Sequence, residues 1–121
     1  MDNTGNDTKS TIDKYFDGWR RKDVAAIEGV LSPTVSFTGP MLSTMGRANF
    51  IAAVNAILPL VIGINFRHLF ENEDHAVAIY DFDCGGLIGV CRMAELLSVK
   101  GGLIQSSEIF FDARPFEEAM K

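Results

Sequence analysis

Two histidines occur in the chain, and the setting of His68 suits proton transfer better than that of His75. His68 lies between Phe66 and Phe70 in a segment of alternating residues, so these three side chains are predicted to share one apolar face. A histidine on such a face is either a core residue with satisfied hydrogen bonds or a pocket acid or base, because imidazole titrates near neutral pH. His75 ends a polar turn and is expected to face solvent.

Tyr15 and Arg92 are the other side chains whose chemistry could serve a ligand. The Tyr15 hydroxyl could donate a hydrogen bond to a ligand carbonyl, or the ring could fill the core with its hydroxyl at the rim. Arg92 shares a predicted strand face with Ala94 and Leu96. A buried guanidinium there would hold a carboxylate or an enolate oxygen of a ligand, form a structural ion pair, or cover apolar surface with its stem. Together with His68, these two residues are the candidate catalytic groups.

Asp81 and Asp83 lie two residues apart on a predicted strand, so both carboxylates face the same side of the sheet. An even number of residues in the following glycine-rich turn would place Asp81 on the face of Arg92, whereas an odd number would place Tyr80 and Phe82 there. The apolar character of Tyr80 and Phe82 favours those residues inward. We therefore expect the two aspartates to face outward.

The elements that would position these residues follow from hydrophobic periodicity. Apolar residues at helical spacing predict a first helix from about Thr8 or Ser10, a second that Asp23 caps, and a third that Ser43 or Thr44 caps. A short strand separates the second and third helices. From residue 64 onward the apolar period changes to two, which predicts three or four long strands in a meander. Helices segregated from consecutive strands are typical of an α+β domain with an antiparallel sheet curled around the helices.

Size and composition limit the classes of function. The 121 residues suffice for one domain, predicted at 8–121 after a disordered segment at 1–7. With a net charge of −5 and scattered basic residues, the chain lacks the clustered positive face that nucleic acid requires. No apolar run reaches the roughly 18–20 residues that span a bilayer, and no signal peptide is evident, so we expect a cytoplasmic protein that does not bind membranes.

No cofactor or metal is expected from the motifs. The glycines at 85, 86 and 89 lie in a predicted hairpin with no helix after it, which is not the context of a dinucleotide-binding motif. The two histidines and two cysteines lack a metal-ligand spacing. Cys84 and Cys91 are expected to be free, half-buried thiols.

Three local segments carry a family resemblance. They are YFDGWRRKDVAAI at 15–27, the Gly46-Arg47 opening of the third helix, and GGLIQSSEIFFDARPF at 101–116. In order and spacing they resemble the NTF2-like superfamily and, within it, the SnoaL-like group, over residues 11–116. The resemblance implies an α+β, cystatin-like cone, in which three N-terminal helices pack on a curved antiparallel sheet and enclose an apolar pocket. The superfamily includes isomerases, cyclases, dehydratases, epoxide hydrolases and proteins that only bind ligands, so the fold does not specify the activity.

The resemblance also allows two catalytic patterns to be compared with the chain. Ketosteroid isomerases use a helix tyrosine, a general-base aspartate after the first strand and a protonated aspartic acid on a later strand. These positions fall on Tyr15, Gly39 and Ala94, and because glycine and alanine cannot transfer protons, steroid isomerisation by that route is not expected. Epoxide hydrolases use an Asp–Arg arrangement, which would require Asp81 to face Arg92, and a second aspartate at a position occupied here by Ile109.

By the same resemblance the face of Arg92 lines the pocket. The predicted lining is aromatic with a few polar points, as small-molecule sites usually are. It comprises Tyr15, Trp19, Phe37, Val54, His68, Tyr80, Phe82, Arg92, Ser107, Ile109 and Phe111. The outer face of the sheet is predicted to be apolar, which favours a homodimer. It comprises Val77, Ile79, Met93, Leu97 and Phe110.

Three functions remain open from the sequence. The first is a SnoaL-like domain that binds a small, mostly apolar, oxygenated metabolite, with or without turnover. The second is a cofactor-independent isomerase, lyase or cyclase that uses His68 or Tyr15 as acid or base and Arg92 as the partner of an oxyanion. The third is a dimeric interaction module without catalysis, which a pocket filled by its own side chains would favour.

Overall fold

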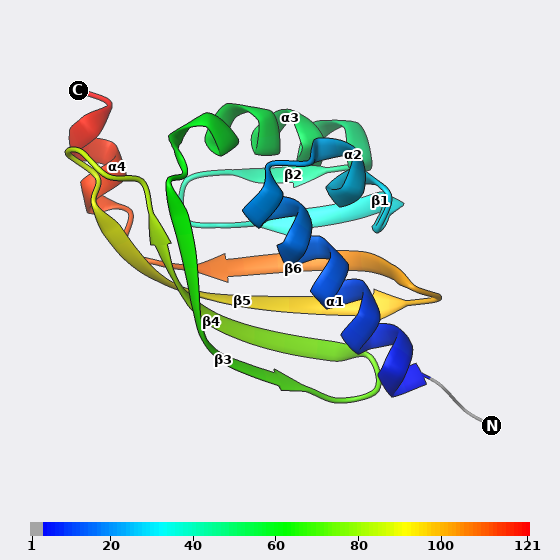
Figure 1. The fold of residues 1–121 in the computed structure, drawn as a ribbon. Helices are drawn as coiled ribbons and strands as arrows, with labels where there is room; N and C mark the ends of the chain where they lie inside the picture. The colour runs from blue at the N-terminus through cyan, green and yellow to red at the C-terminus, as the bar shows by residue number, and fades with distance from the viewer. Residues whose placement is uncertain (1–3) are drawn as a thin grey trace.

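The computed structural model describes residues 4–121 and contains three helices before the long strands (Figure 1). They are α1 (Thr4–Arg21), α2 (Val24–Glu28) and α3 (Arg47–Ile57), and the 3-10 turn η1 (Leu58–Leu60) extends α3. Helix α1 begins earlier than the predicted start near Thr8 or Ser10, and residues 1–3 of the segment predicted to be disordered lie outside the described residues. Asp23 caps α2 as predicted, because its carboxylate accepts a hydrogen bond of 3.1 Å from the backbone N–H of Ala26.

The start of α3 differs from the prediction. Its N-cap is Gly46, with φ at 89°, and no side chain caps the helix. Ser43 and Thr44, the predicted caps, instead belong to the short strand β2 (Ser43–Met45), which pairs with β1 (Leu31–Thr38). A glycine at position 46 permits the left-handed backbone that redirects the chain from β2 into α3.

Six strands form one curved sheet in the order β2-β1-β6-β5-β4-β3. The long strands are β3 (Gly63–Glu71), β4 (His75–Asp83), β5 (Val90–Lys100) and β6 (Leu103–Phe110), and a short helix, α4 (Arg114–Ala119), follows. Every pairing is antiparallel except that of β1 with β6, which is parallel. Figure 1 shows the sheet curving around α1, with α3 lying beside α2 and β1. The predicted α+β fold, with helices packed on a curved, mostly antiparallel sheet, is confirmed.

The core lies between α1, α3 and the inner face of the sheet. Strand β5 contributes its odd-numbered residues to this face, including the buried Met93 and Leu97. The prediction that Met93 and Leu97 face outward is therefore wrong, as is the prediction that Arg92 faces inward. Residues 84–89 separate the last pair of β4 and β5, Asp83 with Val90, and this even number sets Arg92 directly across from Asp81.

A β-bulge changes the face of His68. Phe66 pairs with Tyr80, but His68 pairs with Ile79, so Arg67 is an extra residue in β3. Phe66 faces the core, where its ring centroid lies 4.7 Å from that of Phe16. His68 is exposed on the outer face and stacks on Phe70, with ring centroids 5.9 Å apart. The prediction that Phe66 and His68 share a face is wrong, because the bulge reverses the alternation between them.

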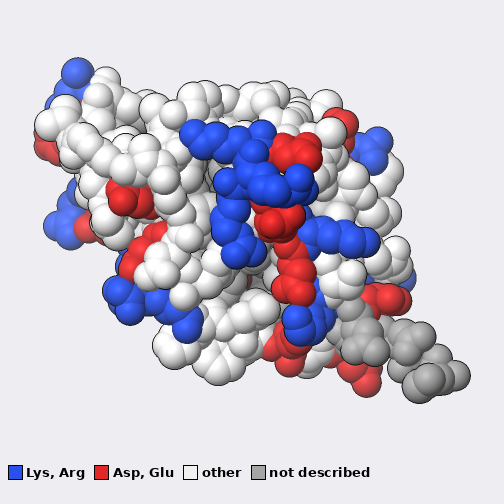
Figure 2. Space-filling model, in the orientation of Figure 1, with Lys and Arg blue, Asp and Glu red and all other residues white. Residues whose placement is uncertain are grey.

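The face of the molecule that carries α1 is strongly charged, with both signs mixed (Figure 2). Lys9 pairs with Asp13 at 2.9 Å and Arg21 pairs with Asp17 at 2.8 Å, each across one turn of the helix. Acidic side chains therefore lie among the basic ones along α1. Among the helices of residues 4–121, none combines the length and the apolar character that crossing a bilayer requires.

Candidate functional site

A cavity of about 390 Å³ lies between the helices and the inner face of the sheet. Its wall is almost entirely apolar and includes many aromatic rings. The lining residues come from α1, α3, η1, α4, five strands and the segments that connect them. They comprise Tyr15, Phe16, Trp19, Phe37, Gly39, Met41, Leu42, Phe50, Ala53, Val54, Ile57, Leu60, Ile64, Tyr80, Phe82, Ile88, Met93, Glu95, Ile109, Phe111, Phe116 and Met120. Four of these, Met41, Leu42, Leu60 and Met120, are also exposed to solvent and so mark where the cavity opens.

Most of the residues predicted to line a pocket lie in this cavity. They are Tyr15, Trp19, Phe37, Val54, Tyr80, Phe82, Ile109 and Phe111. Ser107 faces the same side but lies beneath the cavity surface, fully buried. His68 and Arg92 do not reach it.

The polar end of the cavity is a buried carboxyl group, Glu95, which is only 2% exposed. Three hydroxyl groups from three different elements donate hydrogen bonds to it. Tyr80 of β4 binds Oε1 at 2.8 Å, while Tyr15 of α1 and Ser107 of β6 bind Oε2 at 3.0 and 2.6 Å. The packing of α1 against the inner face of the sheet thus assembles one cluster, defined here as the Glu95 cluster, of Tyr15, Tyr80, Glu95 and Ser107.

No cation pairs with Glu95 among the residues that the structure describes. Burial raises the pKa of the Glu95 carboxyl, while the hydroxyl donors of Ser107, Tyr80 and Tyr15 act in the opposite direction. Burial and the neighbouring carboxyl raise the pKa of Tyr15 and of Tyr80 well above the usual value. Both phenols therefore keep their protons at neutral pH and remain donors to Glu95.

The Glu95 cluster places one titratable group within an apolar, aromatic cavity. A carboxyl in such a setting can bind a ligand by hydrogen bonding or exchange a proton with it, and a pKa raised by burial is common to groups with either role. The prediction from the sequence missed Glu95, although a signal was present. Apolar residues occupy the odd positions of β5 around it, namely Cys91, Met93, Leu97 and Val99, and that alternation identifies Glu95 as inward.

The position predicted for a protonated acid, Ala94, lies on the other face of β5 from Glu95. Ala94 is half-buried and pairs with Ile79 and Phe110, which point outward. The position predicted for a general base, Gly39, does line the cavity, but space there is limited. A Cβ atom at Gly39 would lie 3.0 Å from Cγ2 of Ile109. The acidic group of this cavity is thus Glu95, one residue beyond the predicted position.

Asp81 and Arg92 face each other on the outer side of the sheet, away from the cavity. Arg92 Nε donates to Asp81 Oδ1 at 2.6 Å, and Arg67 Nε donates to Oδ2 at 2.8 Å. Asp81 points outward as predicted, and its side chain is 13% exposed between the two guanidinium groups. The Asp–Arg arrangement considered for an epoxide hydrolase is therefore present in composition but lies on the face opposite the cavity.

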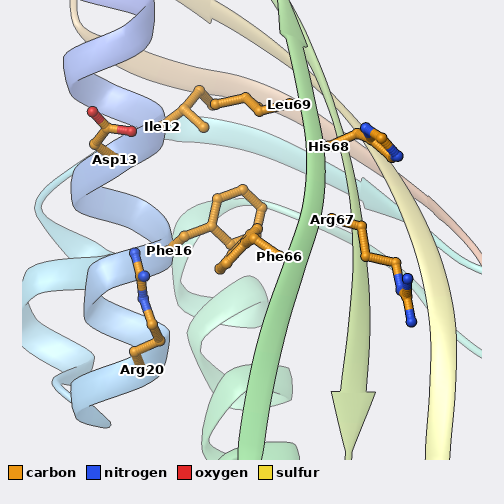
Figure 3. Close-up of a pocket in the computed structure, with 8 residues that line it drawn as sticks. All are labelled: Ile12, Asp13, Phe16, Arg20, Phe66, Arg67, His68 and Leu69. Atoms are coloured by element: carbon orange, nitrogen blue, oxygen red, sulfur yellow. The ribbon is translucent and has the colours of Figure 1, made fainter.

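A second, smaller hollow of about 290 Å³ lies between α1 and β3 (Figure 3). Phe16 and Phe66 meet across it, and the guanidinium of Arg20 lies 5.1 Å from the centre of the Phe66 ring. Figure 3 shows the side chains of His68 and Arg67 pointing away from α1, so only their backbone contributes to this hollow. It therefore brings no titratable group of β3 toward the core.

Neither cysteine is paired, with Cys84 half-buried and Cys91 buried, and burial raises the pKa of both thiols. Within residues 4–121, no three side chains of the metal-binding types gather closely enough to hold a metal ion. The chemistry available to the cavity is thus that of one carboxyl and its hydroxyl partners.

Comparison with known proteins agrees with the fold. The sequence profile of the SnoaL-like domain family matches residues 12–107. A protein from Kribbella flavida DSM 17836 is 23% identical, with a TM-score of 0.86 over 92% of this chain and 91% of that chain. No curated protein matches the chain.

Two further crystal structures are similar in fold. A steroid delta-isomerase from Pseudomonas aeruginosa is 15% identical, with a TM-score of 0.80 over 94% of this chain and 88% of that chain. TerC, co-crystallised with polyporic acid, is 18% identical, with a TM-score of 0.78 over 93% of this chain and 96% of that chain. At these identities the likeness shows a shared fold and not a shared activity.

Proposed function

The chain belongs to the SnoaL-like domain family, and from this premise we propose that it binds a small, mostly apolar, oxygenated metabolite in the cavity above Glu95. One observation carries the proposal. The cavity has an aromatic and aliphatic wall, and its buried polar groups converge on a single carboxyl. Such a combination, a largely apolar surface with a few placed polar groups, is typical of small-molecule sites.

The geometry supports entry of a ligand from outside. The exposed lining residues Met41, Leu42, Leu60 and Met120 surround an opening, and the two methionines have flexible side chains that can adjust to a ligand. TerC, a fold neighbour, was co-crystallised with polyporic acid, which supports the use of this fold for holding a small-molecule ligand. A cavity of this volume is not filled by the protein's own side chains, which disfavours the alternative of an interaction module with a vestigial pocket.

The proposal is tested by thermal unfolding in the presence of small ketones, lactones, epoxides, alcohols and aromatic acids. A compound present at about 100 times its dissociation constant should add about 2.7 kcal/mol of stability. Ala53→Phe, which places a ring in the cavity from α3, should abolish the shift, and Ala52→Phe, at an exposed position of the same helix, should keep it. Shifts that survive Ala53→Phe would show that binding occurs elsewhere, and the proposal would then be wrong.

A second candidate function is a cofactor-independent isomerase, lyase or cyclase, and the position of Glu95 beside Tyr15 favours it. Tyr15 lines the cavity as predicted for an acid or base, but Glu95 replaces His68 as the other candidate acid or base, and Arg92 lies on the opposite face of the sheet. If a ligand found by thermal unfolding is also converted, Glu95→Gln should lower kcat by about 10²–10⁴-fold, the usual contribution of a general acid or base. An unchanged kcat in folded Glu95→Gln would exclude proton transfer by this group.

We also propose a homodimer formed through the outer face of the sheet. Phe70, Val90, Leu96 and Phe110 are exposed there, and Val77 and Ile79 are half-buried beside them. A face with this apolar content is favourable to cover. Analytical ultracentrifugation should find a dimer in the natural protein and a monomer after Phe110→Asp. A natural protein that is monomeric at micromolar concentration would contradict this proposal.

A further inference from the structure

The Glu95 cluster contains three hydroxyl protons, and all three point at one carboxyl group. Tyr15 and Ser107 donate to Oε2, and Tyr80 donates to Oε1. A hydroxyl has one proton and two lone pairs, and an ionised carboxylate only accepts. Three converging hydroxyl groups suit the ionised form of Glu95, because each can donate a hydrogen bond to a negative oxygen and so stabilise it.

The consequence concerns what a ligand meets at this end of the cavity. With the three protons committed to Glu95, Tyr15 and Tyr80 present only lone pairs to the cavity. Oε1 has accepted one hydrogen bond where Oε2 has accepted two, so Oε1 also keeps accepting capacity. The polar atoms that the Glu95 cluster offers to the cavity are therefore acceptors, and a ligand group that can only accept finds no proton there.

We propose that the cavity selects ligands whose polar end donates a hydrogen bond, a hydroxyl or an amine, over ligands that end in a carbonyl or carboxylate. This inference rests on the proposed function and specifies the ligand class of the same site. A carbonyl oxygen placed against Glu95 would lose its hydrogen bonds to water without replacement, and a carboxylate would add repulsion between two negative charges. A hydroxyl or ammonium group instead fills the remaining acceptor position on Oε1.

The aromatic wall of the cavity can accommodate a ligand that ends in either a hydroxyl or an ammonium group. Trp19 and Phe50 each pack edge to face against Tyr15, Phe82 packs edge to face against Trp19, and all of these rings line the cavity. Ring faces attract a cation, so an ammonium group would be favoured by the aromatic wall as well as by the negative carboxyl. A hydroxyl would gain the hydrogen bond alone. The shared chemistry is the donated hydrogen bond, and the two donors are separated by experiment.

The test uses three compounds with the same bicyclic body, indan-2-ol, 2-aminoindane and indan-2-one, titrated into the protein by calorimetry. The alcohol and the amine should each bind at least about tenfold more tightly than the ketone, the ratio that one satisfied buried hydrogen bond provides. If the amine binds more tightly than the alcohol, the charge of the ammonium group also contributes to affinity. If the two bind equally, the hydrogen bond alone explains the preference over the ketone. A ketone that binds as tightly as the alcohol would overturn the inference.

Glu95→Gln provides the decisive variant, because its amide brings N–H donors to the site in place of a carboxylate. The preference for the alcohol over the ketone should fall to about equal affinity or reverse. Glu108→Gln, on the outer face of β6, is the matched control and should keep the tenfold ratio. An unchanged ratio in folded Glu95→Gln would show that Glu95 does not select the head group.

The two proposals fail in different ways. If compounds of the thermal panel bind but its ketones are preferred over its alcohols, only the selection of a donor is wrong. If neither the indanes nor any other compound binds, the proposed function is wrong and this inference falls with it.

Discussion

On the inner face of the sheet Glu95 meets only neutral hydroxyl groups, whereas on the outer face Asp81 is held between two guanidinium groups. The two acids lie on neighbouring strands, β5 and β4. Hydrogen bonds from Arg92 first, and then from Arg67, lower the pKa of Asp81. Burial raises the pKa of Glu95, and its three hydroxyl donors only partly oppose that effect. The two faces of one sheet therefore shift the pKa values of two carboxyl groups in opposite directions.

The difference identifies where the molecule is arranged for a ligand. An outward acid with two arginines is electrostatically satisfied and needs nothing further. A buried acid without a cation is less stable in its ionised form, and groups whose pKa is shifted in this way cluster at functional sites. The groups that surround each acid therefore indicate a ligand site better than the acid alone does. From the sequence, Asp81 and Arg92 resembled a catalytic pair, but the structure places them away from the cavity.

The largest effect is expected when Glu95 loses the donors that allow it to ionise. Tyr15→Phe combined with Ser107→Ala leaves Oε2 without a hydrogen bond. Hydrogen bonds to a charged group contribute about 1.5–3 kcal/mol each, so losing two should lower the free energy of unfolding by roughly 3–6 kcal/mol at pH 8. The loss should become smaller as pH is lowered, because the protonated form of Glu95 depends less on these donors. Urea unfolding at pH 8 and pH 5 measures the difference.

Ser106→Ala is the matched control, because it removes a hydroxyl from the neighbouring position on the other face of β6. Its effect should be smaller and should not depend on pH in this range. A double variant that loses as much stability at pH 5 as at pH 8 would mean that the hydroxyls stabilise packing and not the charge of Glu95.

A smaller effect, opposite in sign, is expected from removing the charge itself. Because the pKa of folded Glu95 is above its unfolded value, the folded protein binds more protons, and stability is lost as pH rises from about 4.5 through the raised pKa. Glu95→Gln removes this loss and should be the more stable protein at pH 8, by about 1.4 kcal/mol for each unit of the shift. Thermal unfolding from pH 4.5 to 8.5 gives the comparison.

Glu108→Gln should keep the pH dependence of the natural protein. If Glu95→Gln were less stable than the natural protein at pH 8, the three hydroxyl donors would more than offset the cost of burying the Glu95 carboxylate. Glu95 would then be a structural acid like Asp81, and the contrast between the two faces would be lost.

The sequence was sufficient for the elements and insufficient for the faces of two strands. Periods of 3.6 and 2 are local properties, so the helices around Tyr15 and Val54 and the long strands could be predicted. The face of Arg92 depends on how many residues the turn before it contains, and the face of His68 depends on a bulge at Arg67. Neither feature is determined by the residues of the strand alone.

Errors in strand phase also explain why the cavity wall was predicted better than its chemistry. Tyr80 and Phe82 were placed inward by their own apolar character, which is local information. Glu95 could be placed only by trusting the alternation of its apolar neighbours over the family position at Ala94. In this fold a shift of one residue exchanges an acid that faces the cavity for an alanine that faces outward.

The smallest effect is expected on the outer face, where Asp81→Asn tests the other half of the contrast. A lowered pKa means that the contribution of Asp81 is present above its unfolded value of about 3.8 and is lost as pH falls through the lowered pKa. The natural protein should therefore lose stability more steeply than Asp81→Asn below pH 4, and the two should differ little in their slopes between pH 5 and 8. Added salt should reduce the difference between them, since Arg67 and Arg92 are largely exposed and their attraction to Asp81 is screened. A pH dependence of Asp81→Asn that changed above pH 5 instead would place Asp81 in the same class as Glu95 and remove the distinction between the two faces of the sheet.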